Sequence, residues 1–165
     1  MRTTLAPRGK TPVIEQQGAH RLKVSVVAAL WKTAGTGLVR LHHWAYPEAS
    51  LAAEDYADYL EDLMQRLPGR PVIVVHDEGG LHRGELIGEL REHYYPRLSL
   101  EFMPTYAPEL NPVEAVWNYV KDKELANFAP WDVEHLAEMV NAVLLTLHTD
   151  QPRLRSFLTA TPLRW

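Results

Sequence analysis

The chain has 165 residues, of which 46% are hydrophobic, and it carries a formal net charge of −4 at pH 7. This length suits one domain, and the apolar fraction suffices for a buried core, whereas the negative charge argues against a broad DNA-coating surface. No apolar run approaches the roughly 20 residues of a membrane span, and no charged-then-apolar leader is present, so we expect a cytoplasmic protein without a membrane partner. The absence of cysteine excludes disulfides and zinc–thiolate sites.

The first part of the chain predicts a β-hairpin. Apolar residues alternate with polar ones over 21–31, which indicates a strand with one buried face. The glycines within 35–37 supply a turn, and 38–44 returns as the second strand. His42 and His43 are adjacent on that strand, so we expect their side chains on opposite faces. We therefore interpret both as ordinary strand histidines and not as joint metal ligands.

A helix, a strand and a second helix are expected next. Apolar residues recur at helical spacing over 51–67, and Ser50 is placed to cap this helix. The unbroken apolar run 72–75 is typical of a strand buried on both faces of a sheet. The second helix is expected over 82–94. Its residues spaced for packing are Leu86, Leu90 and Tyr94.

Another strand and helix follow. Residues 98–102 alternate between apolar and polar, which predicts a strand with one buried face. Asn111 then stands as a helix N-cap, with Pro112 at the first helical position and Glu114 at the third. The amide groups and the dipole of a helix N-terminus favour a carboxylate at this place. Trp117 is most simply a core anchor of the same helix.

The C-terminal part predicts one long helix. Asp132 is its expected cap, and Pro152 is expected to end it. Its buried stripe consists of Val133, Leu136, Val140, Val143, Leu144 and Leu147. The tail 153–165 contains basic and aromatic residues, and the sequence assigns it no place.

Two acids stand at the ends of the central elements. Asp77 lies where the strand 72–75 leaves the core, and ligands collect at the carboxyl ends of strands in open α/β sheets. A carboxylate there, facing Glu114 at a helix start, suits a hard cation such as Mg²⁺. Simpler interpretations stand beside this one. Glu114 and Asn111 also form a good capping box worth about 1 kcal/mol, and an Asp at a strand end is common in turns.

The residues around these acids resemble one family. They read His-Asp-Glu-Gly-Gly-Leu-His at 76–82 and Met-Pro-Thr-Tyr-Ala-Pro-Glu-Leu-Asn-Pro-Val-Glu-Ala-Val-Trp-Asn-Tyr-Val-Lys at 103–121. Both strings are similar to the catalytic half of the mariner-type DDE transposases, which are DDE superfamily endonucleases of bacterial insertion sequences. The second string is the specific one, because it is long. The 36 residues between Asp77 and Glu114 also suit the spacing of that family.

The N-terminal residues extend the resemblance and also limit it. Residues 6–12, Ala-Pro-Arg-Gly-Lys-Thr-Pro, resemble the segment just after the family's first catalytic Asp, so the resemblance covers roughly residues 3–147. In the family a strand ending in Asp precedes that segment, yet no Asp occurs here before Asp55. We therefore expect that the first acid and the first strand are missing, as is the upstream helix-turn-helix region. Glu78 replaces the Asn that the family commonly has there.

The resemblance implies a fold, a reaction and a set of site residues. The fold is α/β, a ribonuclease-H-like mixed sheet flanked by helices, as a single N-terminally truncated domain over 1–165 that lacks the first, central strand. The reaction is metal-dependent DNA strand cleavage and strand transfer. Asp77 and Glu114 are then catalytic residues that hold Mg²⁺ or Mn²⁺. His82 is a supporting residue near a phosphate or ligand, with a packing role as its alternative, and Asn111 holds the turn that aims Glu114.

The resemblance also implies partners. DNA is expected as both transposon ends and target, and the expected contacts are Arg8, Lys10 and Lys121. A solvated basic N-terminal end is the alternative for the first two. A homo-oligomer or an upstream-encoded N-terminal part is expected to complete the protein.

Three functions stay open at this point. The chain is a transposase catalytic domain, incomplete because the first Asp is missing, or an inactive transposase remnant that acts as a DNA- or protein-binding module. A third class is an α/β protein that binds a nucleotide or small ligand through Gly79 and Gly80. Two glycines without a following Lys-Ser/Thr support that class only weakly.

Overall fold

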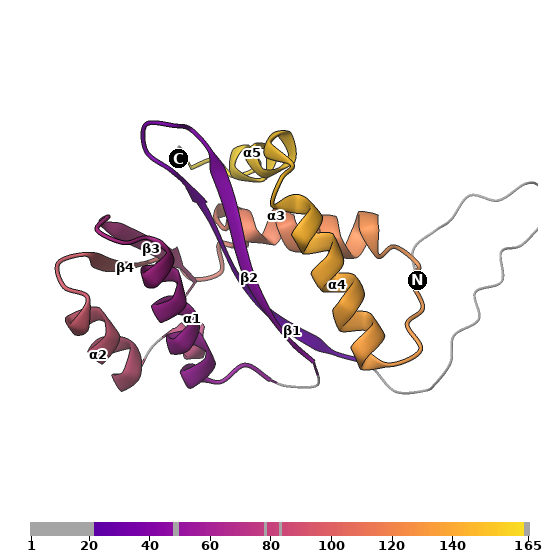
Figure 1. Ribbon diagram of the computed structural model, residues 1–165, viewed down its shortest axis with the longest axis horizontal. Coiled ribbons are helices and arrows are strands. Elements are labelled where there is room, and N and C mark those ends of the chain that lie inside the picture. The colour runs from indigo at the N-terminus through magenta and orange to yellow at the C-terminus, as the bar shows by residue number, and fades with distance from the viewer. Residues whose placement is uncertain (1–21, 48–49, 78, 83, 164–165) are drawn as a thin grey trace, which may run out of the picture.

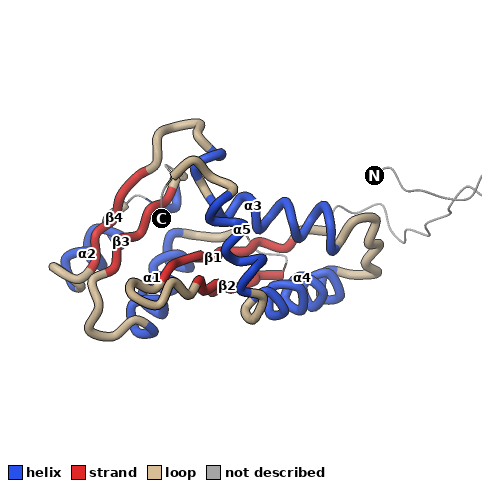
Figure 2. Tube along the Cα trace, turned by 90° about the horizontal axis from the view of Figure 1, so that it is seen from above, coloured by secondary structure: helices blue, strands red, loops and turns tan. Residues whose placement is uncertain are grey.

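The computed structural model describes residues 22–47, 50–77, 79–82 and 84–163, and Figures 1 and 2 show their arrangement. The strands and helices, in chain order, are β1 (Val24–Lys32), β2 (Val39–Pro47), α1 (Ala53–Arg66), β3 (Val72–His76), α2 (Glu85–His93), β4 (Leu98–Phe102), α3 (Pro112–Tyr119), α4 (Val133–Leu147) and α5 (Gln151–Thr159). Short 3-10 turns cover Gly80–His82 and Pro108–Leu110, and a π-helical turn covers Val120–Glu124.

β1 and β2 form the antiparallel hairpin that the alternating pattern predicts. The register pairs Val24 with Pro47 and Lys32 with Val39. The turn depends on glycine, because residues 35 and 37 have φ angles of 83° and 65°. These lie in the left-handed region, which a Cβ atom disfavours. The sequence prediction of this hairpin is confirmed.

The two hairpin histidines point to opposite faces, as predicted. His42 Nε2 lies 2.6 Å from Asp62 Oδ2 on α1, and the His42 ring stacks on Tyr59. His43 Nε2 lies 2.8 Å from Asn141 Oδ1 on α4. Burial is the largest influence on the pKa of His42 and lowers it, although the hydrogen bond to Asp62 acts in the opposite direction. Each histidine therefore fastens the hairpin to the helix on its own side.

The hairpin lies between two hydrophobic layers (Figure 1). One layer packs β1 and β2 against α3, α4 and α5, and its buried residues are Val39, Leu41, Val116, Val120, Val140, Val143, Leu144, Leu147, Leu154, Phe157 and Leu158. The other layer joins α1 and α2 with Val27 of β1 and Val74 of β3. Among the described helices, none is long and apolar enough to cross a membrane.

The C-terminal tail forms a helix that the sequence analysis did not foresee. Pro152 does not end the long helix, because α4 ends at Leu147 and Pro152 lies in the first turn of α5. A proline is tolerated there, since the first amide groups of a helix have no intrahelical partner. The Val39 N–H donates to Gln151 Oε1 at 3.1 Å, and Gln151 Nε2 donates to the Val39 carbonyl at 2.7 Å. α5 is thus tied to the start of β2.

β3 and β4 form a separate, parallel pair. The prediction that the run 72–75 is buried on both faces is wrong, because Ile73 is 69% exposed and Val75 is 36% exposed. Val74 points to the other face and packs against the layer of α1 and α2. Among the described strands, β4 is the only neighbour of β3. One face of β3 is therefore exposed, whereas the sequence pattern predicts that both faces are buried.

The start of α1 differs from the prediction. Ser50 is not its cap, since its hydroxyl oxygen accepts a hydrogen bond from Lys23 Nζ at 3.2 Å. Ala52 holds the N-cap position instead, and its N–H donates to Asp55 Oδ2 at 2.8 Å. The Asp55 carboxylate therefore bonds to the N–H of the N-cap residue, while Ala52 itself provides no side-chain cap.

α2 is shorter than the predicted helix over 82–94. Residues 80–82 form a 3-10 turn that precedes it, so the helix begins only at Glu85. Its buried residue is Ile87, which is 4% exposed, whereas Leu86 is 41% exposed. The contact with α1, which the sequence pattern does not reveal, selects this face.

Candidate active site

Asp77 directly follows β3, and its side chain is 60% exposed. The N–H of Gly79 donates to Asp77 Oδ1 at 3.0 Å, which closes a turn of the Asx type. His82 Nδ1 lies 2.8 Å from the same oxygen and 2.9 Å from the Asp77 carbonyl oxygen. Oδ2 accepts no hydrogen bond from a residue in the described ranges. One carboxylate oxygen is thus held in place, while the other is open to a ligand.

Gly79 has a steric role in this turn. A Cβ on this residue would lie 2.9 Å from Asp77 Oδ1 and 3.4 Å from His82 Nδ1, so the carboxylate would have to move. Gly80 has no atom within 4 Å of such a Cβ. The turn at Asp77 therefore accounts for the first glycine of the pair, and the argument for a nucleotide-binding loop loses its main support.

The rings of Tyr56 and His76 pack against the ring of His82. Its ring centroid lies 4.4 Å from that of Tyr56 on α1 and 4.8 Å from that of His76. His76 is 6% exposed, and neither of its ring nitrogens has a partner among the described residues. Burial, followed by the nearby His82, lowers the pKa of His76 to about 4, so this ring is neutral at pH 7. Sequence reasoning missed His76 and Tyr56, although a histidine directly before Asp77 was a usable signal.

The start of α3 presents Glu114. Asn111 Oδ1 accepts from the Val113 N–H at 3.0 Å, and Pro112 takes the first helical position, as predicted. The capping box does not form, because the Asn111 N–H donates to the Pro108 carbonyl at 3.0 Å. The Glu114 side chain is half-buried, and its carboxylate has no hydrogen-bond partner among the described residues. That carboxylate is therefore also open to a ligand.

Replacing the α3 cap tests this local geometry. We expect Asn111→Ala to lower the free energy of unfolding by about 1 kcal/mol, because the Val113 N–H loses its acceptor. Asn111→Asp should cost less than about 0.5 kcal/mol, because a carboxylate caps a helix equally well. Urea denaturation followed by circular dichroism measures both values. Equal losses in the two variants would contradict the capping role.

One cavity brings the predicted site residues together. Its volume is about 910 Å³, and Asp77, His82, Asn111 and Glu114 all line it. The other walls come from β1, β3, α1 and the first turns of α3. Two carboxylates that are far apart in the sequence therefore border the same space.

The other predicted contacts lie elsewhere. Lys121 is exposed in the π-helical turn and does not line the cavity. Arg8, Lys10 and Glu78 lie outside the described residues. Within the described ranges, no group of three His, Asp or Glu side chains could hold a metal ion. The site as described thus has two carboxylates and no third one beside them.

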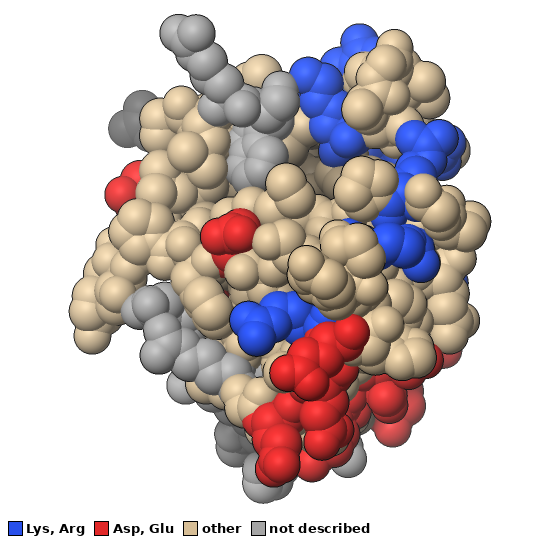
Figure 3. Space-filling view, turned by 90° about the vertical axis from the view of Figure 1, so that its left-hand side faces the viewer, with Lys and Arg blue, Asp and Glu red and all other residues tan. Residues whose placement is uncertain are grey.

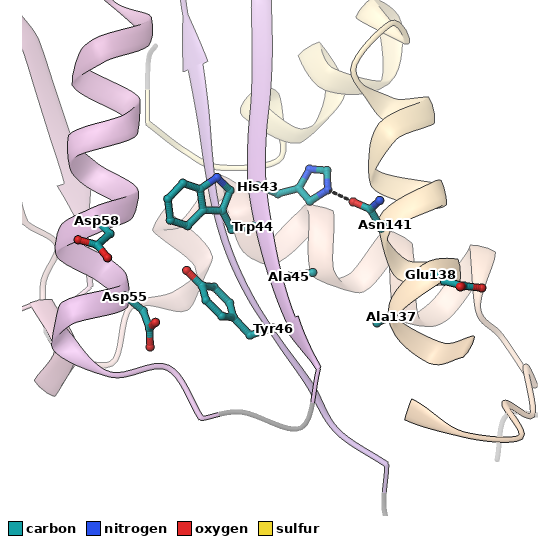
Figure 4. A pocket seen from close by; sticks show the side chains of 9 residues that line it. All are labelled: His43, Trp44, Ala45, Tyr46, Asp55, Asp58, Ala137, Glu138 and Asn141. Carbon is teal, nitrogen blue, oxygen red and sulfur yellow. Dashed lines mark hydrogen bonds between the residues drawn. The ribbon is translucent and has the colours of Figure 1, made fainter. Parts of the chain in front are cut away.

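A second pocket, of about 660 Å³, surrounds part of β2 between α1 and α4. Figure 4 shows its acidic side chains on two sides of the strand, with Asp55 and Asp58 on α1 and Glu138 on α4. His43 points toward α4 and bonds to Asn141 there. Because the strand separates the acids, they do not form one site.

Charge is spread unevenly over the side of the molecule that carries α2, β3 and β4. Figure 3 shows acidic side chains gathered over its lower part and Lys and Arg side chains along its upper right edge. A phosphate backbone near this face would be attracted to the basic edge and repelled by the acidic part.

The sequence matches the model of a protein family described as DDE superfamily endonuclease, over residues 1–136. This match spans more than half of the 165 residues. The chain belongs to the DDE superfamily endonuclease family, in agreement with the resemblance seen in its motifs.

Solved structures of Mos1 transposase have a similar fold. The catalytic domain of Mos1 mariner transposase matches with a TM-score of 0.50 and 14% identity, over 86% of this chain and 83% of that chain. A Mos1 paired-end complex with the left transposon end matches with a TM-score of 0.57 and 14% identity, over 86% of this chain and 52% of that chain. The Mos1 strand transfer complex matches with a TM-score of 0.54 and 16% identity, over 99% of this chain and 50% of that chain. The predicted mixed α/β, ribonuclease-H-like fold is thereby confirmed, and this chain spans about half of the two longer Mos1 chains.

A curated protein of Sinorhizobium fredii (strain NBRC 101917 / NGR234), the uncharacterized protein y4pE/y4sA, is 36% identical over 56 residues. These residues make up 30% of this chain and 42% of that protein. The match is partial and assigns no activity.

Proposed function

We propose that this chain is the catalytic segment of a DNA transposase, which performs metal-dependent DNA strand cleavage and strand transfer. The observation that carries the proposal is that Asp77 and Glu114, the two acids of the motif, line one cavity and keep carboxylate oxygens open to a ligand. Membership in the family supports this proposal. The similarity to Mos1 in complex with a transposon end supports DNA as the substrate.

The donor atoms at the site suit a hard divalent cation. Mg²⁺ prefers oxygen ligands and often takes only one or two protein carboxylates, with waters and phosphates completing its shell. A solved structure of the Mos1 catalytic domain contains Raltegravir with Mg. On this basis Asp77 and Glu114 hold Mg²⁺, or Mn²⁺, in the proposed enzyme. The bound metal would supply Lewis-acid chemistry for phosphodiester cleavage.

The neighbouring residues keep the two carboxylates in position. His82 Nδ1 lies 2.8 Å from Asp77 Oδ1 and so holds this carboxylate in place at the border of the cavity. Asn111 fixes the first turn of α3, which carries Glu114. Lys121 is exposed in the turn that continues α3, where it would contact a DNA phosphate. Arg8 and Lys10 are proposed as further phosphate contacts.

The proposed enzyme needs more than the described residues. The third carboxylate would come from polypeptide outside them, either an upstream-encoded part or another copy of the chain. With that part in place, residues 1–165 act within a single catalytic domain. The recognition of transposon ends is likewise assigned to polypeptide beyond this domain.

Metal dependence tests the proposal. The chain is produced from its own DNA together with the adjoining upstream DNA, and strand cleavage is measured on DNA that carries the sequences flanking the gene. We expect cleavage with Mg²⁺ or Mn²⁺ and none after chelation with EDTA. Cleavage that persists in EDTA would contradict a metal-dependent transposase.

An inactive transposase remnant that binds DNA or protein is the second candidate. It is favoured by the absence, in the described ranges, of three metal-ligating side chains in one group. In that case a cooperatively folded chain binds DNA but cleaves none with either metal. The same assay, run beside a DNA-binding measurement, separates the two functions.

A further inference from the structure

The outer edge of β2 has no strand beside it in the described part of the chain, where β1 is its strand partner. In an antiparallel pair, successive residues direct their N–H and C=O groups alternately toward the partner strand and away from it. Just beyond the ends of the two strands, the Thr33 N–H donates to the Leu38 carbonyl at 2.9 Å, so the even-numbered residues of β2 face β1. The odd-numbered residues therefore direct their backbone groups outward.

Gln151 shows that this outer edge accepts an amide group. The Val39 N–H donates to Gln151 Oε1 at 3.1 Å, and Gln151 Nε2 donates to the Val39 carbonyl at 2.7 Å. A residue of an added antiparallel strand would make the same pair of bonds. Further along the edge, the backbone N–H and C=O groups of His43 and Ala45 bond to none of the described residues. This part of the edge is thus open to a partner strand.

An open pocket lies along the same part of the edge. Its volume is about 660 Å³, and residues 43–46 of β2 line it between α1 and α4 (Figure 4). A strand residue takes about 3.3 Å along the strand, about 4.8 Å between strands and about 10 Å between packed layers. The pocket therefore has room for roughly four residues of an added strand, which is the length of the β2 segment that lines it.

Both flanks of the pocket carry carboxylates. Asp55 and Asp58 of α1 lie on one side of β2, and Glu138 of α4 lies on the other (Figure 4). Among the described residues, no Lys or Arg lines the pocket. Burial, followed by the charges of Asp55 and Asp58, raises the pKa of the Tyr46 hydroxyl. The pocket therefore attracts cationic groups to the strand edge.

The side chains of an added strand would alternate between the two flanks. On the α1 flank they would meet two carboxylates and the rings of Trp44 and Tyr46, whose centroids lie 6.5 Å apart. Arginine suits this flank, because its guanidinium group binds carboxylates and stacks on aromatic rings. On the α4 flank they would meet Glu138. The favoured segment thus has arginine at every second position, on the side of α1.

We propose that the outer edge of β2, at residues 43–46, binds a basic, extended segment of another polypeptide, which adds to the hairpin as an antiparallel strand. Its backbone bonds to His43 and Ala45, and the carboxylates on the two flanks select a cationic sequence. Antiparallel pairing is the more stable kind per residue. The proposal rests on the strand edge and on the charges beside it, and not on the catalytic activity proposed above.

Two other occupants fit less well. A second copy of β2 would bring its own acids against those on α1 and α4, and like charges repel. In residues 1–21 of this chain, the stretches before Pro7 and after Pro12 contain one Lys or Arg each. The stretch between the prolines has two bases, but Pro7, Gly9 and Pro12 all disfavour a strand.

Peptide binding tests the proposal on the full chain. The probe is an amidated peptide of about seven residues in which arginine alternates with threonine, a residue that favours strands, and it carries a fluorophore at its N-terminus. One control peptide has proline at its centre, which removes a backbone donor, and another has glutamate in place of arginine. Fluorescence anisotropy measures the three affinities. We expect the probe to bind at least about tenfold more tightly than either control peptide.

Amide–water exchange NMR locates the bound peptide, because it detects amides that exchange with water within seconds. We expect the His43 and Ala45 amides to exchange rapidly in the free chain, since both point outward. The probe at saturation should slow this exchange at least about tenfold. The Trp44 and Tyr46 amides face β1 and should give no such signal with or without the probe. Attraction between side chains alone would not produce this alternation.

Removing the carboxylates tests the selection of a basic segment. Asp58→Asn combined with Glu138→Gln should weaken binding of the probe about tenfold. Glu85→Gln combined with Glu89→Gln is the matched control, because it changes the net charge equally on α2, outside the pocket. It should alter the affinity by no more than about twofold. All four side chains are exposed, so both double variants should keep the fold.

Four results would overturn the proposal. The first is absence of binding by the folded chain, or equal binding of the probe and the proline peptide. The second is equal weakening by the two double variants, which would indicate attraction to the net charge alone. The third is slow exchange at 43 and 45 in the free chain that becomes fast on deletion of residues 1–21, which would identify this segment as the occupant. The fourth is protection that grows with protein concentration together with dimer formation. None of these measurements uses DNA or a metal ion, so their outcome is independent of the cleavage assay.

Discussion

Replacing Glu114 by glutamine is expected to reduce the rate of metal-dependent DNA strand cleavage about a thousandfold. This factor corresponds to the loss of several kcal/mol of transition-state stabilisation by the bound metal. Glutamine keeps the size of the side chain but removes the charge that a hard cation prefers. The Glu114 carboxylate bonds to none of the described residues, so the fold should keep its stability. The rate on end-labelled DNA at fixed Mg²⁺ measures the effect, and thermal unfolding checks the fold.

Glu109→Gln is the matched control. Glu109 is exposed in the 3-10 turn before α3 and does not line the cavity, so the same change of charge should alter the rate by no more than about twofold. Asp77→Asn should be as damaging as Glu114→Gln, and the double variant little worse than either, because both act through one site. Undiminished cleavage by Glu114→Gln would remove this residue from the catalytic site.

Truncating Leu144 is expected to have the largest effect on stability. This side chain is fully buried between the hairpin and the helices that cover it, with an exposure of 0%. Leu144→Ala should lower the free energy of unfolding by about 2–5 kcal/mol, since it removes buried methyl groups and leaves a cavity behind. Because small domains have a stability of about 5–15 kcal/mol, this change is a large fraction of the total. Chemical denaturation of the purified chain measures it.

The adjacent residue provides the comparison. Leu145 lies on the same helix but is 51% exposed, so Leu145→Ala should cost about 1 kcal/mol or less. Both variants have the same change of helix propensity, which cancels in the difference between them. A similar loss in the two variants would mean that α4 does not pack as described.

Elements with local signals could be predicted from the sequence. The hairpin follows from alternation and a glycine turn, and the starts of α3 and α4 follow from Asn111 and Asp132, whose side chains accept from backbone N–H groups as expected. Each signal lies within a few residues of the feature that it predicts. The same holds for the two carboxylates, whose placement at a strand end and a helix start is read directly from the flanking residues.

Features that depend on distant contacts could not be predicted in this way. A proline is compatible with both the end and the start of a helix, so Pro152 does not by itself reveal α5. The exposure of Ile73 depends on which strands lie beside β3, and a run of apolar residues carries no information about its neighbours. The contact of His82 with Tyr56 joins the 3-10 turn after β3 to α1, and the sequence does not reveal that His82 Nδ1 lies 2.8 Å from Asp77 Oδ1.

The side-chain amide of Gln151 has a consequence for aggregation. The side-chain amide of Gln151 has a carbonyl oxygen and an NH2 group, and here the oxygen and one N–H are engaged with the backbone of Val39. The outer edge of the hairpin is therefore closed at the first residue of β2 by the chain's own helix. A further molecule cannot extend the ladder from that point, so fibril growth through this edge is blocked where α5 is docked. Loss of α5, by proteolysis or mutation, would expose an edge that favours amyloid-like stacking.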